Sequence, residues 1–167
     1  MANTEDNLMA AYTGESKASR KYLFFAEKAD KEGHKQIARL FRAASEAETV
    51  HARNHLKVMH GIKSTKENLL SAMSGESHEF TEMYPAFIKQ AQGEGQEQAI
   101  NSFDLANKVE KVHHSLYQRA IDELEAGNTM ASKPFFVCQR CGHTVEGEAP
   151  DTCPICGAPK KMFKLVE

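Results

Sequence analysis

Mostly apolar residues, with a few Glu and His among them, recur at alternating steps of three and four along two successive segments near the start of the chain. Between about Thr4 and Lys31 the stripe consists of Leu8, Ala11, Glu15, Ala18, Tyr22, Phe25 and Ala29. Between about His34 and His60 it consists of Ile37, Phe41, Ala44, Glu48, His51, His55 and Val58. This spacing places each set on one face of an α-helix. Two further helices are predicted, from about Thr65 to Gln92 and from about Gly95 to Glu125.

The joints between these helices carry the residues that commonly begin and end helices. Ser64 and Glu67 have the spacing of a capping box, and the joint glycines are Gly33, Gly61, Gly93 and Gly95. Connections this short force antiparallel neighbours, so the pattern predicts a mainly α fold built as a four-helix bundle. Helices of about 27 residues are about 40 Å long, which is enough to bury a site halfway along.

The helical pattern ends near Gly127, and the chain then changes character. We expect a helical domain over residues 1–127, a linker over 128–134 and a small domain over 135–167. The last of these is rich in Gly, Pro and Cys, and its pattern predicts few strands.

The second half of the helical region repeats the first. The same residue type recurs 61 positions later for each of Thr4, Asn7, Leu8, Ala11, Gly14, Glu15 and Ser16. It recurs 62 positions later for each of Tyr22, Phe25, Ala29, Gly33, Phe41, Ala44, Glu48, Val50 and His51. Such agreement indicates an internal duplication of a helix pair. The change of offset means that the second copy has one extra residue between Ser77 and Tyr84, which predicts a π-bulge there.

Six polar residues fall on the inward stripes of the predicted helices. They are Glu15, Glu48, His51, Glu76, Glu110 and His113. Burying one unpaired carboxylate costs several kcal/mol, so four in one core require cations. One Glu from each of two helices and Glu-x-x-His from each of the other two form the di-iron or di-manganese carboxylate pattern. Surface glutamates at chance positions are the alternative for any one residue, but the duplication argues against it for all six.

Several neighbouring residues extend this candidate site. Glu79 lies one turn beyond Glu76 and is predicted to point inward as a seventh ligand, whereas Glu82 should face water. Tyr22 and Tyr84 are candidates for hydrogen bonds that orient ligand carboxylates, although ordinary aromatic core is the alternative. We expect surface positions for the histidines without a duplicated partner, namely His34, His60, His78, His114 and His143.

All four cysteines occur in two Cys-x-x-Cys pairs, Cys138 with Cys141 and Cys153 with Cys156. Two such pairs separated by 11 residues predict a tetrahedral metal site. The spacing alone leaves a structural zinc site and a single-iron rubredoxin site open. A domain of about 33 residues needs its metal to be stable.

Composition excludes several classes of function. The formal net charge is -2 and no Lys/Arg-rich block occurs, so nucleic acid is not an expected partner. No apolar stretch approaches the roughly 20 residues that cross a bilayer, and the first residues are polar and acidic. We therefore expect a cytoplasmic protein without a membrane partner.

These motifs together resemble the rubrerythrin family, and the resemblance covers nearly the whole chain. The motifs are Gly14-Glu15-Ser16, Glu48-x-x-His51, Gly75-Glu76-x-x-Glu79, Thr81-Glu82-Met83-Tyr84-Pro85, Glu110-x-x-His113 and Cys153-Pro-Ile-Cys156-Gly157-Ala158-Pro159-Lys160. The resemblance implies a ferritin-like di-iron bundle followed by a rubredoxin-type domain with one iron. The second Glu of the third helix distinguishes this pattern from ferritins.

The resemblance also implies a peroxidase. Hydrogen peroxide would be reduced to water at two irons bridged by Glu48 and Glu110, with His51 and Glu79 alternating as ligands of one iron. The four-cysteine iron, or zinc after heterologous expression, would sit beside the di-iron site of a partner subunit, so a homodimer or higher homo-oligomer is expected. No dinucleotide fingerprint is present, so an external rubredoxin or NAD(P)H-dependent reductase would supply electrons.

Three other functions remain open at this point. A ferritin-like protein that oxidises and stores iron would form a large hollow oligomer. A scaffold with zinc in the cysteine site would have no redox role. Oxygenase chemistry on an organic substrate is weaker, because no motif in the sequence indicates a substrate pocket.

Overall fold

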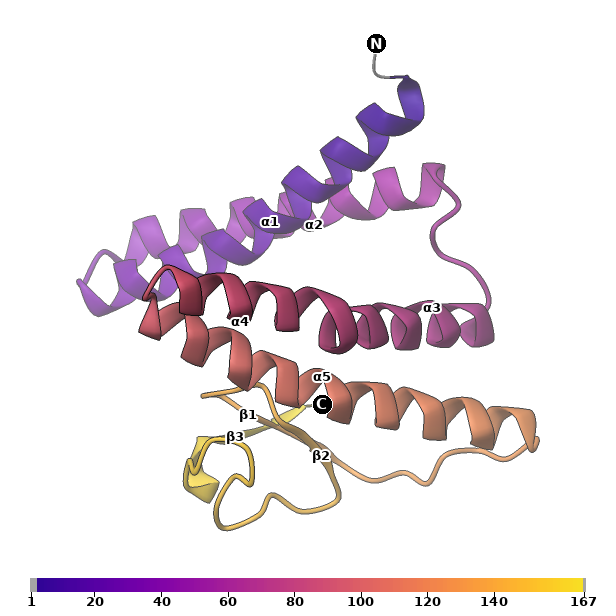
Figure 1. Cartoon of the computed structure of the whole chain (residues 1–167). Coiled ribbons are helices and arrows are strands. Elements are labelled where there is room, and N and C mark those ends of the chain that lie inside the picture. Colours follow the sequence, from indigo (N-terminus) through magenta and orange to yellow (C-terminus); the bar gives the residue numbers. More distant parts are fainter. Residues whose placement is uncertain (1–2, 167) are drawn as a thin grey trace. The chain divides into compact units, whose positions relative to one another are not determined.

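The computed structural model describes residues 3–166 and is mainly helical (Figure 1). Its helical elements are α1 (Thr4–Lys31), α2 (Lys35–Val58), α3 (Thr65–His78), the π-helix η1 (Glu79–Met83), α4 (Tyr84–Gly93) and α5 (Glu97–Glu125). The chain divides into two compact units, Met1–Lys63 and Ser64–Glu167, and each is described by itself. Positions 1, 2 and 167 of the predicted domains lie outside the described residues.

The first unit is a helical hairpin of α1 and α2. Asn3 caps α1 through a reciprocal pair of hydrogen bonds with Asp6, which satisfies amide groups that have no partner inside the helix. Gly33 makes the turn at a φ of +84°, a conformation that glycine adopts without strain. Small residues then let the two helices approach closely, with the Ser45 hydroxyl donating to the Ser19 carbonyl at 2.8 Å.

The second unit begins with a helix that runs through α3, η1 and α4 and then turns back as α5. The predicted capping box of Ser64 and Glu67 is confirmed at the start of α3. Gly95, which corresponds to Gly33 in the repeat, turns the chain at a φ of +67°. The two helix pairs therefore follow the same local rules, as the duplication predicts.

The predicted π-bulge is confirmed, because η1 lies between Ser77 and Tyr84 and contains the extra residue of the second repeat. Tyr84 donates its backbone amide to the carbonyl of Glu79, which is the i to i−5 bond of a π-helix. Pro85 has no amide hydrogen, so the carbonyl of Thr81 lacks its α-helical donor. The proline therefore favours a wider turn at this point.

The C-terminal module is a three-stranded antiparallel sheet in the order β2-β1-β3. Its strands are β1 (Phe135–Cys138), β2 (Thr144–Glu146) and β3 (Phe163–Val166), and the 3-10 helix η2 (Lys160–Met162) precedes β3. Its core contains Cys138, Cys153 and Ala158, with Ile155, Met162 and Phe163 packed against them. Two of the three buried residues in this cluster are thus metal-ligand candidates, so the module has little apolar core of its own.

Within residues 3–166, none of the helices combines the length and the apolar character that a bilayer crossing requires.

Candidate metal centres

The hairpin of α1 and α2 brings together the first set of predicted ligands. Glu15 comes from α1, whereas Glu48 and His51 lie one turn apart on α2. His51 Nδ1 is 2.9 Å from a carboxylate oxygen of Glu48 and 3.9 Å from one of Glu15. The side chain of His51 is 53% exposed.

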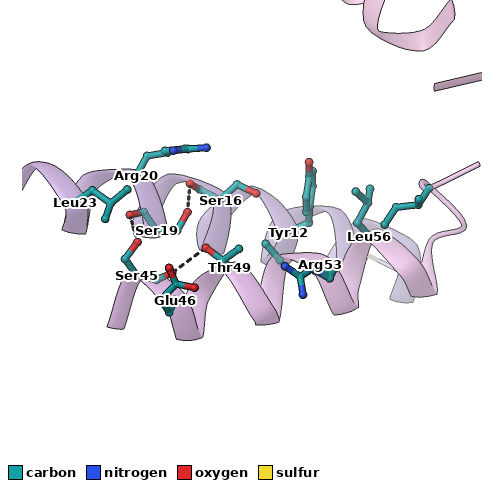
Figure 2. Close-up of a pocket in the computed structure, with 12 residues that line it drawn as sticks. Tyr12, Ser16, Ser19, Arg20, Leu23, Ser45, Glu46, Thr49, Arg53 and Leu56 are labelled. Atoms are coloured by element: carbon teal, nitrogen blue, oxygen red, sulfur yellow. Dashed lines mark hydrogen bonds between the residues drawn. The ribbon is translucent and has the colours of Figure 1, made fainter. Parts of the chain in front are cut away.

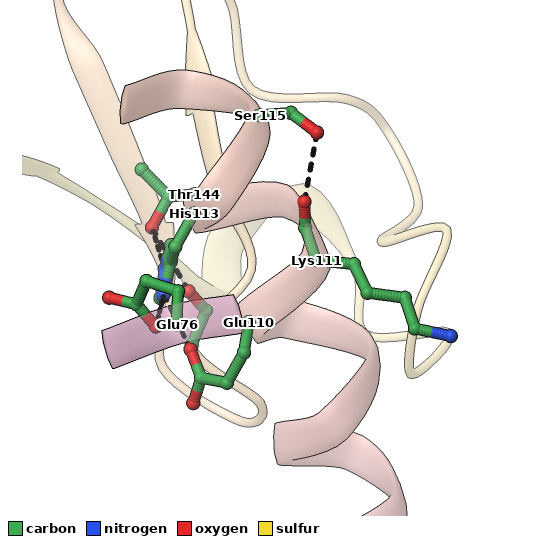
Figure 3. Close-up of polar contacts among 7 residues, drawn as sticks. Glu76, Glu110, Lys111, His113, Ser115 and Thr144 are labelled. Carbon is green, nitrogen blue, oxygen red and sulfur yellow. Dashed lines mark hydrogen bonds and ion pairs between the residues drawn. The ribbon is translucent and has the colours of Figure 1, made fainter. Parts of the chain in front are cut away.

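The second unit repeats this arrangement with Glu76 from α3 and with Glu110 and His113 from α5 (Figure 3). His113 Nδ1 is 2.7 Å from an oxygen of Glu110 and 3.8 Å from one of Glu76. The distance from the His Nδ1 to the Glu three residues before it is 2.9 Å in the first unit and 2.7 Å in the second, a difference of 0.2 Å. This triad is more enclosed, because the His113 side chain is only 27% exposed.

Electrostatics in the second triad favour a bound cation. Burial and the neighbouring carboxylate of Glu110 raise the pKa of Glu76 to about 7. Burial, followed by the charge of Glu76, also raises the pKa of Glu79. Carboxyl groups with raised pKa values are destabilised in their charged form, and a positive ion would relieve that cost.

Tyr22 and Tyr84 occupy equivalent places in the two units. Each packs in a cluster of aromatic rings, with centroids 6.2 Å from Phe41 and from Phe103 respectively. Burial raises the pKa of Tyr84, and the charges of nearby glutamates including Glu110 add to this rise. The charges of the triad's carboxylates therefore reach the Tyr84 hydroxyl, while its role in orienting them stays a prediction.

Among the neighbouring residues, one expectation is confirmed and one is wrong. Glu82 is 73% exposed and lies 3.5 Å from His78, as expected for a residue that faces water. His143 is buried at 9% exposure, contrary to the predicted surface position. Its ring packs edge-on against Phe163, 6.3 Å away, and burial lowers its pKa. The prediction failed because a loop histidine in a short module has no periodic pattern that reports burial.

The four cysteines converge on one point in the C-terminal module. The Sγ atoms of Cys138 and Cys156 are 3.7 Å apart, as are those of Cys141 and Cys153. A disulfide needs about 2.05 Å, whereas thiolates about 2.3 Å from one ion at tetrahedral angles are about 3.8 Å apart. Burial opposes ionisation of Cys138, yet backbone hydrogen bonds from Arg140 and Cys141 bring its pKa below the usual value. The donor set and the spacing fit a tetrahedral metal ion.

One residue beside the second triad escaped the sequence analysis. Thr144, the first residue of β2, places its Oγ1 3.0 Å from His113 Nε2. Thr144 and His113 also line a cavity of about 400 Å³, with Glu76, Tyr117 and Phe135 among its other walls. No local signal could have indicated this contact, because it joins residues 31 positions apart through tertiary packing.

A second cavity lies between α1 and α2 in the first unit (Figure 2) and has a volume of about 540 Å³. Short polar side chains bond along its floor, with the Ser19 hydroxyl donating to the Ser16 carbonyl at 3.0 Å and Thr49 donating to the Ser45 carbonyl at 2.9 Å. The cavity is thus a groove between α1 and α2, and its polar side chains already bond to backbone carbonyls of these two helices.

Comparison with known proteins places this combination of modules. Residues 6–121 match the family described as rubrerythrin, and residues 136–164 match the rubrerythrin, rubredoxin-like domain. Rubrerythrin-2 of Clostridium acetobutylicum is 33% identical over 177 residues, covering 98% of this chain and 96% of that protein. Nigerythrin of Nitratidesulfovibrio vulgaris is 36% identical over 177 residues, covering 98% and 86%. A solved structure of nigerythrin, described as fully reduced and all ferrous, matches with a TM-score of 0.58 over 99% of this chain and 88% of that one.

The fold and the donor groups define a class of helical carboxylate-and-imidazole metal proteins with an appended four-cysteine module. The chain belongs to the rubrerythrin family. Family membership and the donor sets support iron binding in the helical part and in the cysteine module. Mixed oxygen and imidazole donors suit iron, and four thiolates suit iron or zinc.

Proposed function

We propose that this chain is a non-haem di-iron peroxidase that reduces hydrogen peroxide to water and protects against oxidative stress. The observation that carries the proposal is the pair of equivalent carboxylate and imidazole triads in a chain that also has a four-thiol site. Solved structures of nigerythrin are described as mixed-valence and as all ferrous, so a relative matched along 99% of this chain changes redox state.

The proposed ligands divide between the two kinds of site. The two irons of the helical part would be held by Glu15, Glu48, His51, Glu76, Glu79, Glu110 and His113. The single iron of the module would be held by Cys138, Cys141, Cys153 and Cys156. His51 and Glu79 are proposed as alternating ligands of one iron.

The reaction needs two electrons and two protons for each peroxide, since H2O2 + 2 e− + 2 H+ gives 2 H2O. Iron held by the carboxylates and imidazoles would supply the electrons, and iron held by the four thiolates would restore them. The protein supplies the protons. Glu79 is proposed to deliver a proton to the departing oxygen when His51 takes its place as the iron ligand, because its carboxyl group is then free to carry one. Tyr84 keeps its phenol proton, because its pKa is raised.

Single-turnover oxidation of the fully reduced, iron-loaded protein tests the proposal. Stoichiometric hydrogen peroxide is mixed in the absence of oxygen, and the ferric-thiolate absorption of the cysteine site is followed. We expect rapid return of colour with peroxide and slow return with oxygen. Glu79→Ala, which copies Ala18 at the duplicated position, should slow the peroxide reaction by about 100-fold if Glu79 is the proton donor. Glu82→Ala is the matched control and should react at the wild-type rate.

The alternatives give different results in the same experiment. Absence of thiolate colour in protein from iron-replete cells would favour the zinc scaffold. Faster oxidation by oxygen than by peroxide, together with a large hollow oligomer in size-exclusion chromatography, would favour ferritin-like iron storage.

The remaining expectations are proposals of the same function. We propose a homodimer or higher homo-oligomer that works in the cytoplasm and takes electrons from an external rubredoxin or an NAD(P)H-dependent reductase. Light scattering during chromatography tests the oligomer, because a strictly monomeric species with full turnover would contradict it.

A further inference from the structure

His113 uses its two ring nitrogens toward two different neighbours (Figure 3). Nδ1 faces the carboxylates, 2.7 Å from Glu110 and 3.8 Å from Glu76. Nε2 faces away from them and lies 3.0 Å from the hydroxyl of Thr144 on β2. A metal ion held by these carboxylates would have to bind Nδ1, which must then carry no proton.

The hydroxyl of Thr144 has a second contact, to a carbonyl oxygen that can only accept. It donates its only hydrogen to the carbonyl of Gly142, 3.1 Å away. With that hydrogen used, the lone pairs of Thr144 Oγ1 can accept a hydrogen bond from Nε2. Without a metal ion, Nδ1 lies 2.7 Å from an oxygen of Glu110, which is the distance of a hydrogen bond donated by Nδ1. When a metal ion takes the lone pair of Nδ1, the ring proton must be on Nε2, where Thr144 Oγ1 accepts its hydrogen bond.

The Thr144 hydroxyl is held in place by the cysteine module. Gly142 directly follows Cys141, adopts a φ of +85° and donates its amide to the carbonyl of Cys138 at 2.8 Å. A side chain is disfavoured at this φ, so glycine is the residue that lets the knuckle turn here. The same module contacts α5 again through an ion pair between Arg119 and Glu146.

We propose that Thr144 is a positioning residue that holds the Nε2 proton of His113 when a metal ion binds Nδ1, and that it links the first Cys-x-x-Cys turn to the second triad. The inference rests on the proposed function only in requiring a metal ion at the second triad. It adds a residue of the C-terminal module to the machinery of the helical site.

Metal titration of hydroxyl variants tests the role of Thr144. The full chain, with zinc in its cysteine site, is titrated with cobalt(II). The visible absorption bands of cobalt bound at the second triad are followed. Thr144→Val should weaken binding by about tenfold, the lower end of the effect of losing a hydrogen-bond partner of a metal ligand. Thr144→Ser keeps the hydroxyl and should stay within about twofold of the wild type. Arg119→Gln is the control for docking of the module, because it removes the ion pair and leaves Thr144 intact.

Nuclear magnetic resonance gives a second readout that does not depend on catalysis. In the chain fully loaded with zinc, the Nε2 proton of His113 should exchange slowly with water, and Thr144→Val should make the exchange faster. Equal cobalt affinity in Thr144→Val and wild type would overturn the inference. Equal losses in Thr144→Val and Arg119→Gln would also overturn it, because docking alone would then explain them. If the wild-type chain passes both tests but shows no peroxidase activity, only the proposed function is overturned.

Discussion

Among single residues, Glu76 makes the stability of the metal-free protein depend on pH. Its pKa is raised to about 7 from 4.5, first by burial and then by Glu110. The unfolded chain releases this proton near pH 4.5, whereas the folded chain keeps it until about pH 7. Between these values the folded state binds more protons, so its stability falls as the pH rises. The metal-free protein is therefore more stable in acid. Near neutral pH the Glu76 carboxylate becomes charged and can bind a cation.

Urea unfolding of the metal-free chain at about pH 5 and about pH 8 checks this residue. We expect the free energy of unfolding to fall by about 1–2 kcal/mol toward the higher pH, after allowing for solvent screening. Glu76→Gln should abolish most of this dependence. Glu82→Gln should leave it unchanged, because the Glu82 side chain is 73% exposed. A wild-type stability that rises over this range would contradict the assignment.

Iron affinity should show the opposite dependence on pH. A metal ion displaces the proton from Glu76, so binding releases protons and strengthens as the pH rises toward 7.

Individual elements differ in how far the sequence could predict them. The long helices and the π-helix followed from a 3.6-residue period and from the offset change of one residue between the repeats. The strands did not, because β2 has only three residues and a period of two cannot be recognised over that length. The contact of Thr144 with His113 was also missed, since sequence patterns describe faces of elements and not which face of another element they meet.

The extra residue of η1 can be tested as an element, because α1 is its natural counterpart without the insertion. Deletion of Thr81 restores the length of the first repeat, so we expect a folded protein with unchanged helix content by circular dichroism. Glu76 keeps its place, but the residues from Glu79 to Tyr84 return to an α-helical turn. Displacement of Glu79 by about 1 Å should slow the peroxide reaction by about 100-fold at unchanged iron content.

A point substitution separates the insertion from the side chain that it carries. Thr81→Ala removes only the hydroxyl bond to the Ser77 carbonyl at 2.7 Å and should behave like the wild type. If the deletion variant reacts with peroxide at the wild-type rate, the wide turn has no catalytic role.

Across the second unit, the cysteine module contacts the helical triad directly. The core of the module is made largely of its own ligands, with Cys138 and Cys153 at most 2% exposed. A small domain of this kind gains its folding free energy from the metal. The module in turn supplies the hydroxyl of Thr144 to His113. Loss of the metal from the module should therefore reach the helical site.

The variant Cys153→Ser with Cys156→Ser removes half of the thiol ligands and tests this dependence. We expect residues 135–166 to unfold, with fast proteolysis there and in the linker, while the helical circular dichroism is retained. The cobalt(II) affinity of the second triad should fall by about the same tenfold as in Thr144→Val, because both variants leave His113 Nε2 without its hydrogen-bond acceptor. Wild-type protein with zinc in place of iron in the module should keep full affinity, since the fold and not the redox state holds Thr144. An unfolded module beside an unchanged bundle affinity would show that the two sites are independent.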